Sequence, residues 1–165
     1  MPLYWGFFFG EIMKTSTLGV ELIKHFEGCK LEAYCCGGAS WTIGYGHTRG
    51  VEEGDKITKK QAEALLIEDI EMVEHHVDRL VKVELKQHQY DAIVSWCFNL
   101  GCGNLRVSTL LVVLNSGDFE NVSKEILKWD KAGRPLKPVA GLTRRRKAEA
   151  ALFDEGVTDF GKMEK

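Results

Sequence analysis

Three side chains that could take part in acid–base chemistry lie within one short stretch of the chain, residues 25–48. Glu27 stands at the end of a helical pattern, and Thr42 and His47 follow on a run rich in β-forming residues and glycines. A carboxylic acid in a cleft can protonate the leaving group of a bond that water cleaves. By position alone, Glu27 is more simply explained as a solvated side chain beside a helix-ending glycine. Together, the three residue types favour a hydrolase.

The surrounding patterns predict the elements that must position these side chains. Apolar residues recur at helical spacing over residues 18–26, and Gly28 is expected to end that helix. Helix-end carbonyl groups and apolar neighbours would then favour the protonated form of Glu27. The glycine-rich stretch over residues 30–51 predicts a small antiparallel sheet. A capping box at Thr58–Gln61 predicts the start of a long helix that continues to about residue 80.

The rest of the chain reads as helical. Further helices are expected over residues 86–100, 108–114, 118–129 and 143–153, with Pro135 and Pro138 marking a loop before the last. The sequence therefore predicts a mostly helical α+β fold. We expect one domain over residues 15–153, in which a small β-hairpin lobe (residues 15–57, with the first helix) is joined by the long helix to a helical lobe (residues 58–153). Residues 1–14 are expected to form an extension, and residues 154–165 a tail.

Charge and composition exclude several classes of protein. The 165 residues include 22 Lys and Arg against 24 Asp and Glu, a balance that argues against a dedicated nucleic-acid binder. Six cations and no anion fall within residues 134–147. This stretch has two interpretations: a surface for an anionic polymer, or a solvated helix start with internal ion pairs.

The N-terminal and cysteine patterns indicate no anchor and no metal. The apolar run over residues 3–13 is too short for a membrane span and no Lys or Arg precedes Lys14, so neither an anchor nor a signal peptide is expected. Met13 could be the natural start. The five cysteines contain no CxxC pair, which makes a zinc site improbable and favours free thiols in a reducing cytosol. Adjacent His75 and His76 point about 100° apart on a helix and cannot share one ion. No cofactor is expected.

The spacing in the first motif identifies a family resemblance. Glu27 is followed after eight residues by Cys36, after five more by Thr42, and then by Ile-Gly-Tyr-Gly-His ending at His47. This pattern resembles the phage-type lysozymes, the muramidase endolysins of glycoside hydrolase family 24. Two later blocks, CFNLGCGNLRVSTLLVVLNSGDF (residues 97–119) and GLTRRRKAEAALF (residues 141–153), are similar to further blocks of the same family. The resemblance covers residues 15–153 in family order.

The resemblance implies a role for each matching residue. Glu27 would be the general acid, Thr42 the hydroxyl beside the attacking water, and Cys36 would occupy the second catalytic position. The substrate would be peptidoglycan, cut between N-acetylmuramic acid and N-acetylglucosamine, which leads to lysis of the host bacterium.

Binding residues and cellular behaviour are also implied. His47 would be a cleft histidine that supports the hairpin, while Phe98 and Asn99 would lie near the saccharide groove. The enzyme is expected to be a monomer without nucleic-acid partner or stable membrane anchor. It would wait in the host cytoplasm until a holin opens the membrane, and then act on the wall.

Cys36 departs from the better-known members, which have Asp at this position. A free thiol titrates near pH 8.5, and a carboxylate nearby would raise its pKa, so the neutral thiol is expected to dominate at neutral pH. Either a minor thiolate fraction acts as base or nucleophile, or Glu27 and Thr42 carry most of the rate. An oxidised, inactive state that links Cys36 to Cys35 or to a distant thiol is a further hypothesis.

Two other functions stay open from the sequence. Cys36 and His47 could form the nucleophile and base of a hydrolase that cuts the peptide part of the wall. Alternatively, the chain could be an inactive wall-binding relative of lysozymes, although the presence of both Glu27 and Thr42 argues against this.

Overall fold

The computed structural model describes residues 12–35 and 40–158. Helix α1 (Thr17–Glu27) forms as predicted: the side chain of Ser16 accepts a hydrogen bond from the backbone N–H of Gly19 and caps its start. Gly28 ends the helix at φ +65°, a conformation that glycine adopts without steric cost. Because the helix ends there, Glu27 occupies its last position, next to the chain's turn into the sheet.

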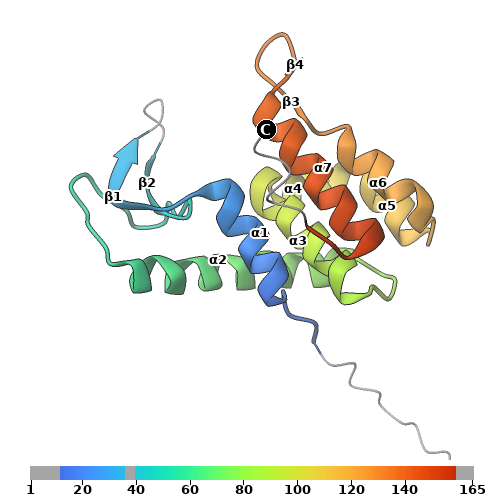
Figure 1. Ribbon diagram of the computed structural model, residues 1–165, viewed down its shortest axis with the longest axis horizontal. Coiled ribbons are helices and arrows are strands. Elements are labelled where there is room, and N and C mark those ends of the chain that lie inside the picture. The colour runs from blue at the N-terminus through green and yellow to red at the C-terminus, as the bar shows by residue number, and fades with distance from the viewer. Residues whose placement is uncertain (1–11, 36–39, 159–165) are drawn as a thin grey trace, which may run out of the picture.

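The predicted antiparallel sheet is present beside α1 (Figure 1). Strand β1 (Lys30–Cys35) pairs with β2 (Trp41–Gly44), with an irregularity between the Lys30–Gly44 and Tyr34–Thr42 pairs. After β2 the chain folds back, and the backbones of Ile43 and His47 exchange hydrogen bonds of 2.9 Å in both directions. This tight turn brings His47 back onto the sheet.

The predicted long helix joins the two lobes. Helix α2 (Lys59–Leu80) begins at the expected capping box, in which Thr58 and Gln61 bond each other's backbone. Figure 1 shows α2 running from the β lobe to beneath the helical lobe. One face of α2 buries Ala62, Leu66, Ile70 and Val77.

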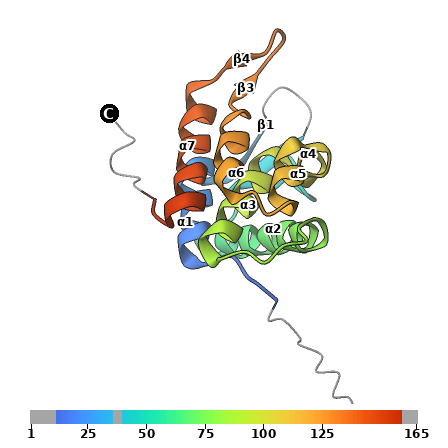
Figure 2. The same ribbon diagram turned by 90° about the vertical axis from the view of Figure 1, so that its right-hand side faces the viewer.

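The helical lobe is built around α3 (Gln87–Leu100). Nine consecutive residues of this helix are buried, so it is the central helix of the lobe. Around it lie α4 (Cys102–Val107), α5 (Thr109–Asn115), α6 (Phe119–Leu127) and α7 (Ala140–Glu155) (Figure 2). Trp96 of α3 is fully buried, with its ring 5.1 Å from that of Trp129. The core of this lobe therefore fixes α7 against α3, and α3 also packs against α1.

Several boundaries differ from the predictions. Helix α4 was not predicted, because its six residues are too few to show a helical period. Helix α7 begins three residues before the predicted start at residue 143 and continues two residues past residue 153, while α6 ends at Leu127 rather than at residue 129. The predicted loop around Pro135 is a small exposed hairpin of β3 (Lys131–Ala132) and β4 (Lys137–Pro138). Each of these strands has one partner, so Pro138 can lie in β4 without breaking a second ladder.

The described start of the chain is attached to the helical lobe. Glu74 of α2 accepts hydrogen bonds from Lys14 Nζ at 3.0 Å and from the backbone N–H of Thr15 at 2.6 Å. Within residues 12–35 and 40–158, no helix has the length and apolar character needed to cross a bilayer. The predictions for residues 1–11 and for the end of the tail fall outside the described residues.

Candidate active site

Glu27 lies where α1, the turn after β2, and α7 meet. Its Oε1 accepts a hydrogen bond from Nη1 of Arg145 at 2.6 Å, and its side chain keeps 21% of its surface exposed. Its Oε2 lies on the side of the β lobe, 3.5 Å from where a methyl group on Gly46 would stand. One carboxylate oxygen is therefore fixed by Arg145, and the other faces the hairpin.

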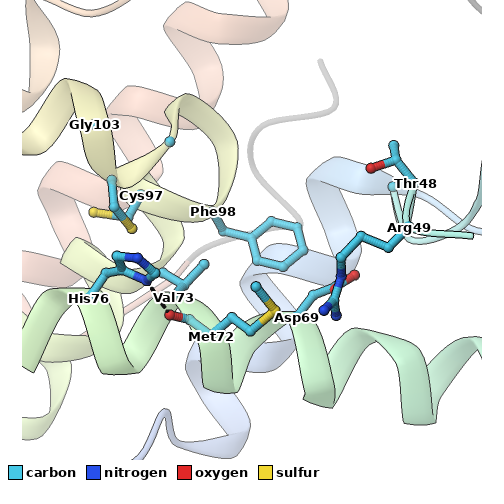
Figure 3. Close-up of a pocket in the computed structure, with 12 residues that line it drawn as sticks. Thr48, Arg49, Asp69, Met72, Val73, His76, Cys97, Phe98 and Gly103 are labelled. Carbon is cyan, nitrogen blue, oxygen red and sulfur yellow. Dashed lines mark hydrogen bonds and ion pairs between the residues drawn. The ribbon is translucent and has the colours of Figure 1, made fainter. Parts of the chain in front are cut away.

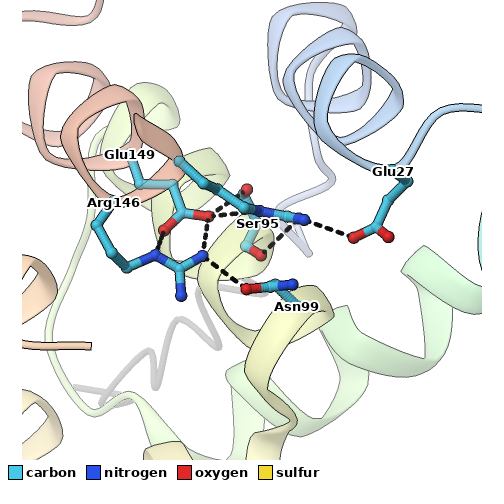
Figure 4. A network of polar contacts seen from close by, with 6 residues as sticks. Glu27, Ser95, Asn99, Arg146 and Glu149 are labelled. Carbon is cyan, nitrogen blue, oxygen red and sulfur yellow. Dashed lines mark hydrogen bonds and ion pairs between the residues drawn. The ribbon is translucent and has the colours of Figure 1, made fainter. Parts of the chain in front are cut away.

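A buried cation lies beside Glu27, whereas the sequence predicted only apolar residues and helix-end carbonyl groups around it. The guanidinium of Arg145 is almost completely buried and also lies over the ring of Phe26, 5.6 Å from its centroid. Its neighbour Arg146 is fully buried (Figure 4). Internal ion pairs are thus the correct interpretation for these two of the six cations, while the four others are exposed, namely Arg134, Lys137, Arg144 and Lys147.

The other two catalytic candidates lie on the hairpin. Thr42 is partly exposed on β2, opposite Tyr34 of β1. Because side chains alternate along a strand and the adjacent Ile43 is buried, Thr42 points to the face opposite the core. Cys36 lies outside the described residues, in the connection between β1 and β2. The preceding Cys35 ends β1 as an exposed free thiol.

His47 is buried and held by contacts at both ring nitrogens. Nδ1 lies 2.8 Å from Oδ2 of Asp69 on α2, and Nε2 lies 3.0 Å from the carbonyl oxygen of Arg49. Arg49 in turn donates to the second oxygen of Asp69 at 3.1 Å. These bonds attach the hairpin to α2. With both nitrogens engaged, His47 has no free ring nitrogen for the base of a Cys–His hydrolase.

A pocket of about 440 Å³ opens beside the hairpin, between α2 and the junction of α3 with α4 (Figure 3). Phe98 lines it, and Thr48 and Arg49 contribute from the hairpin. Its α2 wall was not predicted and consists of Asp69, Met72, Val73 and His76. The spacing of these four residues places them on one helical face, a signal that the many acidic residues of α2 obscured.

Asn99 is placed differently from Phe98. Its Oδ1 accepts a hydrogen bond from Nη2 of Arg146 at 3.0 Å, and it does not line the pocket. Arg146 thus fixes the orientation of its amide.

The sequence did not predict that two thiols lie together on the wall of this pocket. Cys97, near the end of α3, and Cys102, at the start of α4, share a side-chain hydrogen bond. This bond, aided by the nearby charge of His76, lowers the pKa of the Cys102 thiol to about 7, although burial acts in the opposite direction. The same bond and burial raise the pKa of Cys97. Cys102 is therefore an unusually acidic thiol at the pocket.

The sequence is similar to those of phage endolysins. Residues 24–149 match the family model described as phage lysozyme. The endolysin of Acyrthosiphon pisum secondary endosymbiont phage 1 is 49% identical over 144 residues, which cover 86% of this chain and 99% of that protein. The endolysin of Bacillus phage B103 is 42% identical over 147 residues, or 87% of this chain and 55% of that protein. A SAR-endolysin of Enterobacteria phage P21 is 34% identical over 113 residues, or 68% of this chain and 67% of that protein.

The fold is also similar to the solved structures of a muramidase domain and of an endolysin. The muramidase domain of SpmX from Asticaccaulis excentricus superposes with a TM-score of 0.83 at 38% identity, covering 86% of this chain and 98% of that domain. An endolysin from Escherichia coli O157:H7 phage FAHEc1 superposes with a TM-score of 0.82 at 34% identity, covering 89% and 97% of the two chains.

Proposed function

This chain belongs to the phage lysozyme family, and we propose that Glu27 is the general acid of its reaction. The family and its endolysin relatives make the protein a peptidoglycan-hydrolysing muramidase. The observation that supports Glu27 most strongly is its position: a partly exposed carboxyl group between the two lobes, with one oxygen bound to buried Arg145. That contact leaves Oε2, on the hairpin side, to carry the proton.

In the proposed reaction, Glu27 gives its proton to the oxygen that links N-acetylmuramic acid to N-acetylglucosamine. The bond from that oxygen to the anomeric carbon breaks, and the sugar on the oxygen leaves as an alcohol. Water adds to the anomeric carbon and loses a proton, while Glu27 regains one from solvent. Each cleavage therefore consumes one water and produces one new reducing end.

Thr42 and Cys36 are proposed to act on the water. The face of β2 that Thr42 occupies is turned away from the core, which is compatible with a hydroxyl that holds a water molecule. Cys36 would take the proton of that water as a minor thiolate or, if it is dispensable, leave the rate to Glu27 and Thr42. We expect Cys36→Asp to keep activity; full activity in Cys36→Ala would remove this thiol from the mechanism.

The pocket beside the hairpin is proposed to hold part of the glycan. Phe98 offers an apolar ring on its wall, and the Asp69–His47 contact fixes the hairpin on the opposite side. Asn99, which lies outside this pocket, would offer the amide nitrogen that Arg146 leaves free to another part of the glycan.

The general-acid role is tested by Glu27→Gln, which keeps the size of the side chain and removes its acidic proton. We expect clearing of a peptidoglycan suspension to slow by at least about 100-fold, the usual contribution of a general acid. The matched control is Glu32→Gln on β1, an exposed carboxylate that pairs with Lys56 on the protein surface. Its activity should equal that of wild type. Activity in Glu27→Gln equal to the control would refute the assignment.

The protein acts on the cell wall, and we propose that it waits in the cytoplasm for a membrane lesion. Expression without a holin should then leave cells intact until a membrane-permeabilising agent is added. The similarity to a SAR-endolysin supports the opposite expectation, export before lysis. Lysis without holin or permeabiliser would therefore overturn the cytoplasmic stage.

We also propose that the protein is a monomer. Sedimentation at the mass of one chain, 18.6 kDa, is expected of it.

A further inference from the structure

A carboxylate in the helical lobe, Glu149 on α7, is completely buried and lies between the two buried arginines. Its Oε1 is 3.2 Å from Nε of Arg145 and 3.0 Å from Nη2 of Arg146. Its Oε2 is 2.8 Å from Nε of Arg146, and Ser95 of α3 donates its hydroxyl to Oε1 at 2.8 Å. Glu149 is therefore the common partner of both guanidinium groups.

The same two arginines reach the proposed active site at different points. Arg145 donates to Glu27 at the end of α1, and Arg146 donates to Asn99 at the end of α3 (Figure 4). A continuous path of polar contacts thus runs from Glu27 through Arg145, Glu149 and Arg146 to Asn99. Two carboxylates and two guanidinium groups make its formal charge zero.

Such a cluster is expensive to bury. Desolvation raises the pKa of Glu149 and lowers that of Arg146, although each is bound to the opposite charge. Apolar side chains of similar size would often stabilise a protein as well or better in such a place. Positioning of the side chains that the cluster contacts is therefore a better explanation for its presence than stabilisation of the fold.

We propose that Glu149 is a positioning residue that, through Arg145 and Arg146, fixes Glu27 and Asn99 relative to each other and balances the charge beside Glu27. This inference rests on the proposed role of Glu27 as general acid. Among the described residues, Arg145 of α7 donates to Glu27, the charge of Arg146 also interacts with it, and Glu149 lies between these two arginines. On the hairpin side its described neighbour is the uncharged Gly46, and on α3 the members of the network, Ser95 and Asn99, are neutral.

The charge balance gives the proposal a distinctive consequence. If Glu149 loses its charge, both guanidinium groups remain and Glu27 becomes their only anionic partner in the network. Positive charge favours the ionised form of a carboxyl group, which has no proton to donate. The alkaline limb of the pH–activity profile should therefore move to lower pH.

The primary test is Glu149→Gln, which keeps the shape of the side chain and its contact with Ser95. Initial rates of peptidoglycan clearing are measured for this variant and for wild type from acidic to alkaline pH. We expect the alkaline limb to shift to lower pH by on the order of one unit. An equal loss of rate at every pH, or an unchanged rate, would overturn the proposal.

The matched control is Asp91→Asn, which also neutralises a buried carboxylate. Asp91 of α3 accepts hydrogen bonds from the backbone and hydroxyl of Ser16, at the opposite end of α1 from Glu27. Its profile should keep the position of the wild-type alkaline limb, even if the variant is less stable. A shift equal to that of Glu149→Gln would show that loss of stability alone produces the effect.

Two further variants keep the test decisive if Glu149→Gln does not fold. Glu149→Asp keeps the charge and shortens the side chain, so its alkaline limb should stay in place while its rate falls. The double variant Glu149→Gln/Arg146→Gln removes one charge of each sign and avoids an unpaired buried cation. It should have a smaller shift than the single variant and a reduced rate; wild-type rate and profile in the double variant would overturn the proposal.

The failure of this inference is distinguishable from that of the proposed function. If Glu27→Gln remains active, the general-acid assignment fails. If Glu27→Gln is inactive and Glu149→Gln has the wild-type profile, the general acid stands and only the role of Glu149 is refuted.

Discussion

At the scale of single residues, the Glu27 carboxyl group lies between a residue that donates a hydrogen bond to it, Arg145, and a residue without a side chain, Gly46. Gly46 has φ +91°, and a methyl group there would stand 3.5 Å from Oε2 of Glu27. The turn after β2 therefore needs the positive φ that glycine adopts without strain, and a methyl group added there would be in van der Waals contact with Oε2 of Glu27.

We predict that Gly46→Ala lowers activity beyond what its backbone strain explains. The substitution places a left-handed alanine in the turn, at a cost of about 1–2 kcal/mol, and adds a methyl group beside Oε2. The control is Gly54→Ala, which has a similar positive φ of +86° but nothing within 4 Å of the added methyl group. Urea unfolding should give the two variants similar losses of stability, while clearing assays should show the larger loss for Gly46→Ala. Equal activities would contradict this account.

The Cys102 thiol gives a prediction of chemical reactivity. Because its pKa is lowered to about 7, more of this thiol is ionised at neutral pH than of an ordinary cysteine, and the thiolate is the form that alkylates. Iodoacetamide at pH 7 should therefore label Cys102 faster than Cys29, measured by peptide mass spectrometry over time. Cys97→Ala removes the hydrogen bond that lowers the pKa and should slow the labelling of Cys102.

This reactivity affects how the Cys36 hypothesis is tested. An alkylating reagent would modify the pocket wall at Cys102 as well as the hairpin, so loss of activity in wild type would be ambiguous. The Cys29→Ser/Cys102→Ser background narrows the test: because Cys97 is buried, loss of activity on alkylation there would implicate a hairpin thiol, Cys35 or Cys36. Labelling of Cys29 at the rate of Cys102 in wild type would contradict the acidity of Cys102.

At the scale of elements, local signals in the sequence were sufficient where capping and periodicity agree. Ser16 and Gly28 delimit α1, and the capping box at Thr58 starts α2, because these features act within a few residues. The contacts of Glu27 with Arg145 and of His47 with Asp69 join residues 118 and 22 positions apart. No local pattern encodes such pairs, so the sequence singled out Glu27 and His47 as candidates but did not indicate their partners.

The attachment of the hairpin to α2 gives a prediction at this scale. Asp69→Ala removes the carboxylate that bonds both His47 and Arg49, and we expect it to reduce stability by about 1–3 kcal/mol. Activity should also fall, because the hairpin carries Thr42 and the turn beside Glu27. The control is Glu68→Ala, an exposed neighbour on the same helix, which should change stability by less than about 0.5 kcal/mol. Urea unfolding that fails to separate the two variants would contradict the role given to Asp69.

At the scale of the whole molecule, the local patterns already predicted a small β-hairpin lobe joined by a long helix to a helical lobe, and the family resemblance implied the same arrangement. The structure has it, with α2 between the two lobes (Figure 1). The β3–β4 hairpin and α4 lie within stretches that composition marked only as loop or left unassigned, since two-residue strands and a six-residue helix carry too few residues for a period. The run of six cations allowed internal ion pairs as one interpretation, but it did not show which of the cations are buried or that Glu149 is their partner.

The measurement that tests the central claim most directly is the chemical analysis of fragments released from purified peptidoglycan by wild type and by Glu27→Gln. We predict that wild type creates new reducing ends on N-acetylmuramic acid, without new free amino groups, and that Glu27→Gln creates neither. New amino groups would indicate cleavage of the peptide, and reducing ends released by Glu27→Gln at the wild-type rate would show that another group supplies the proton.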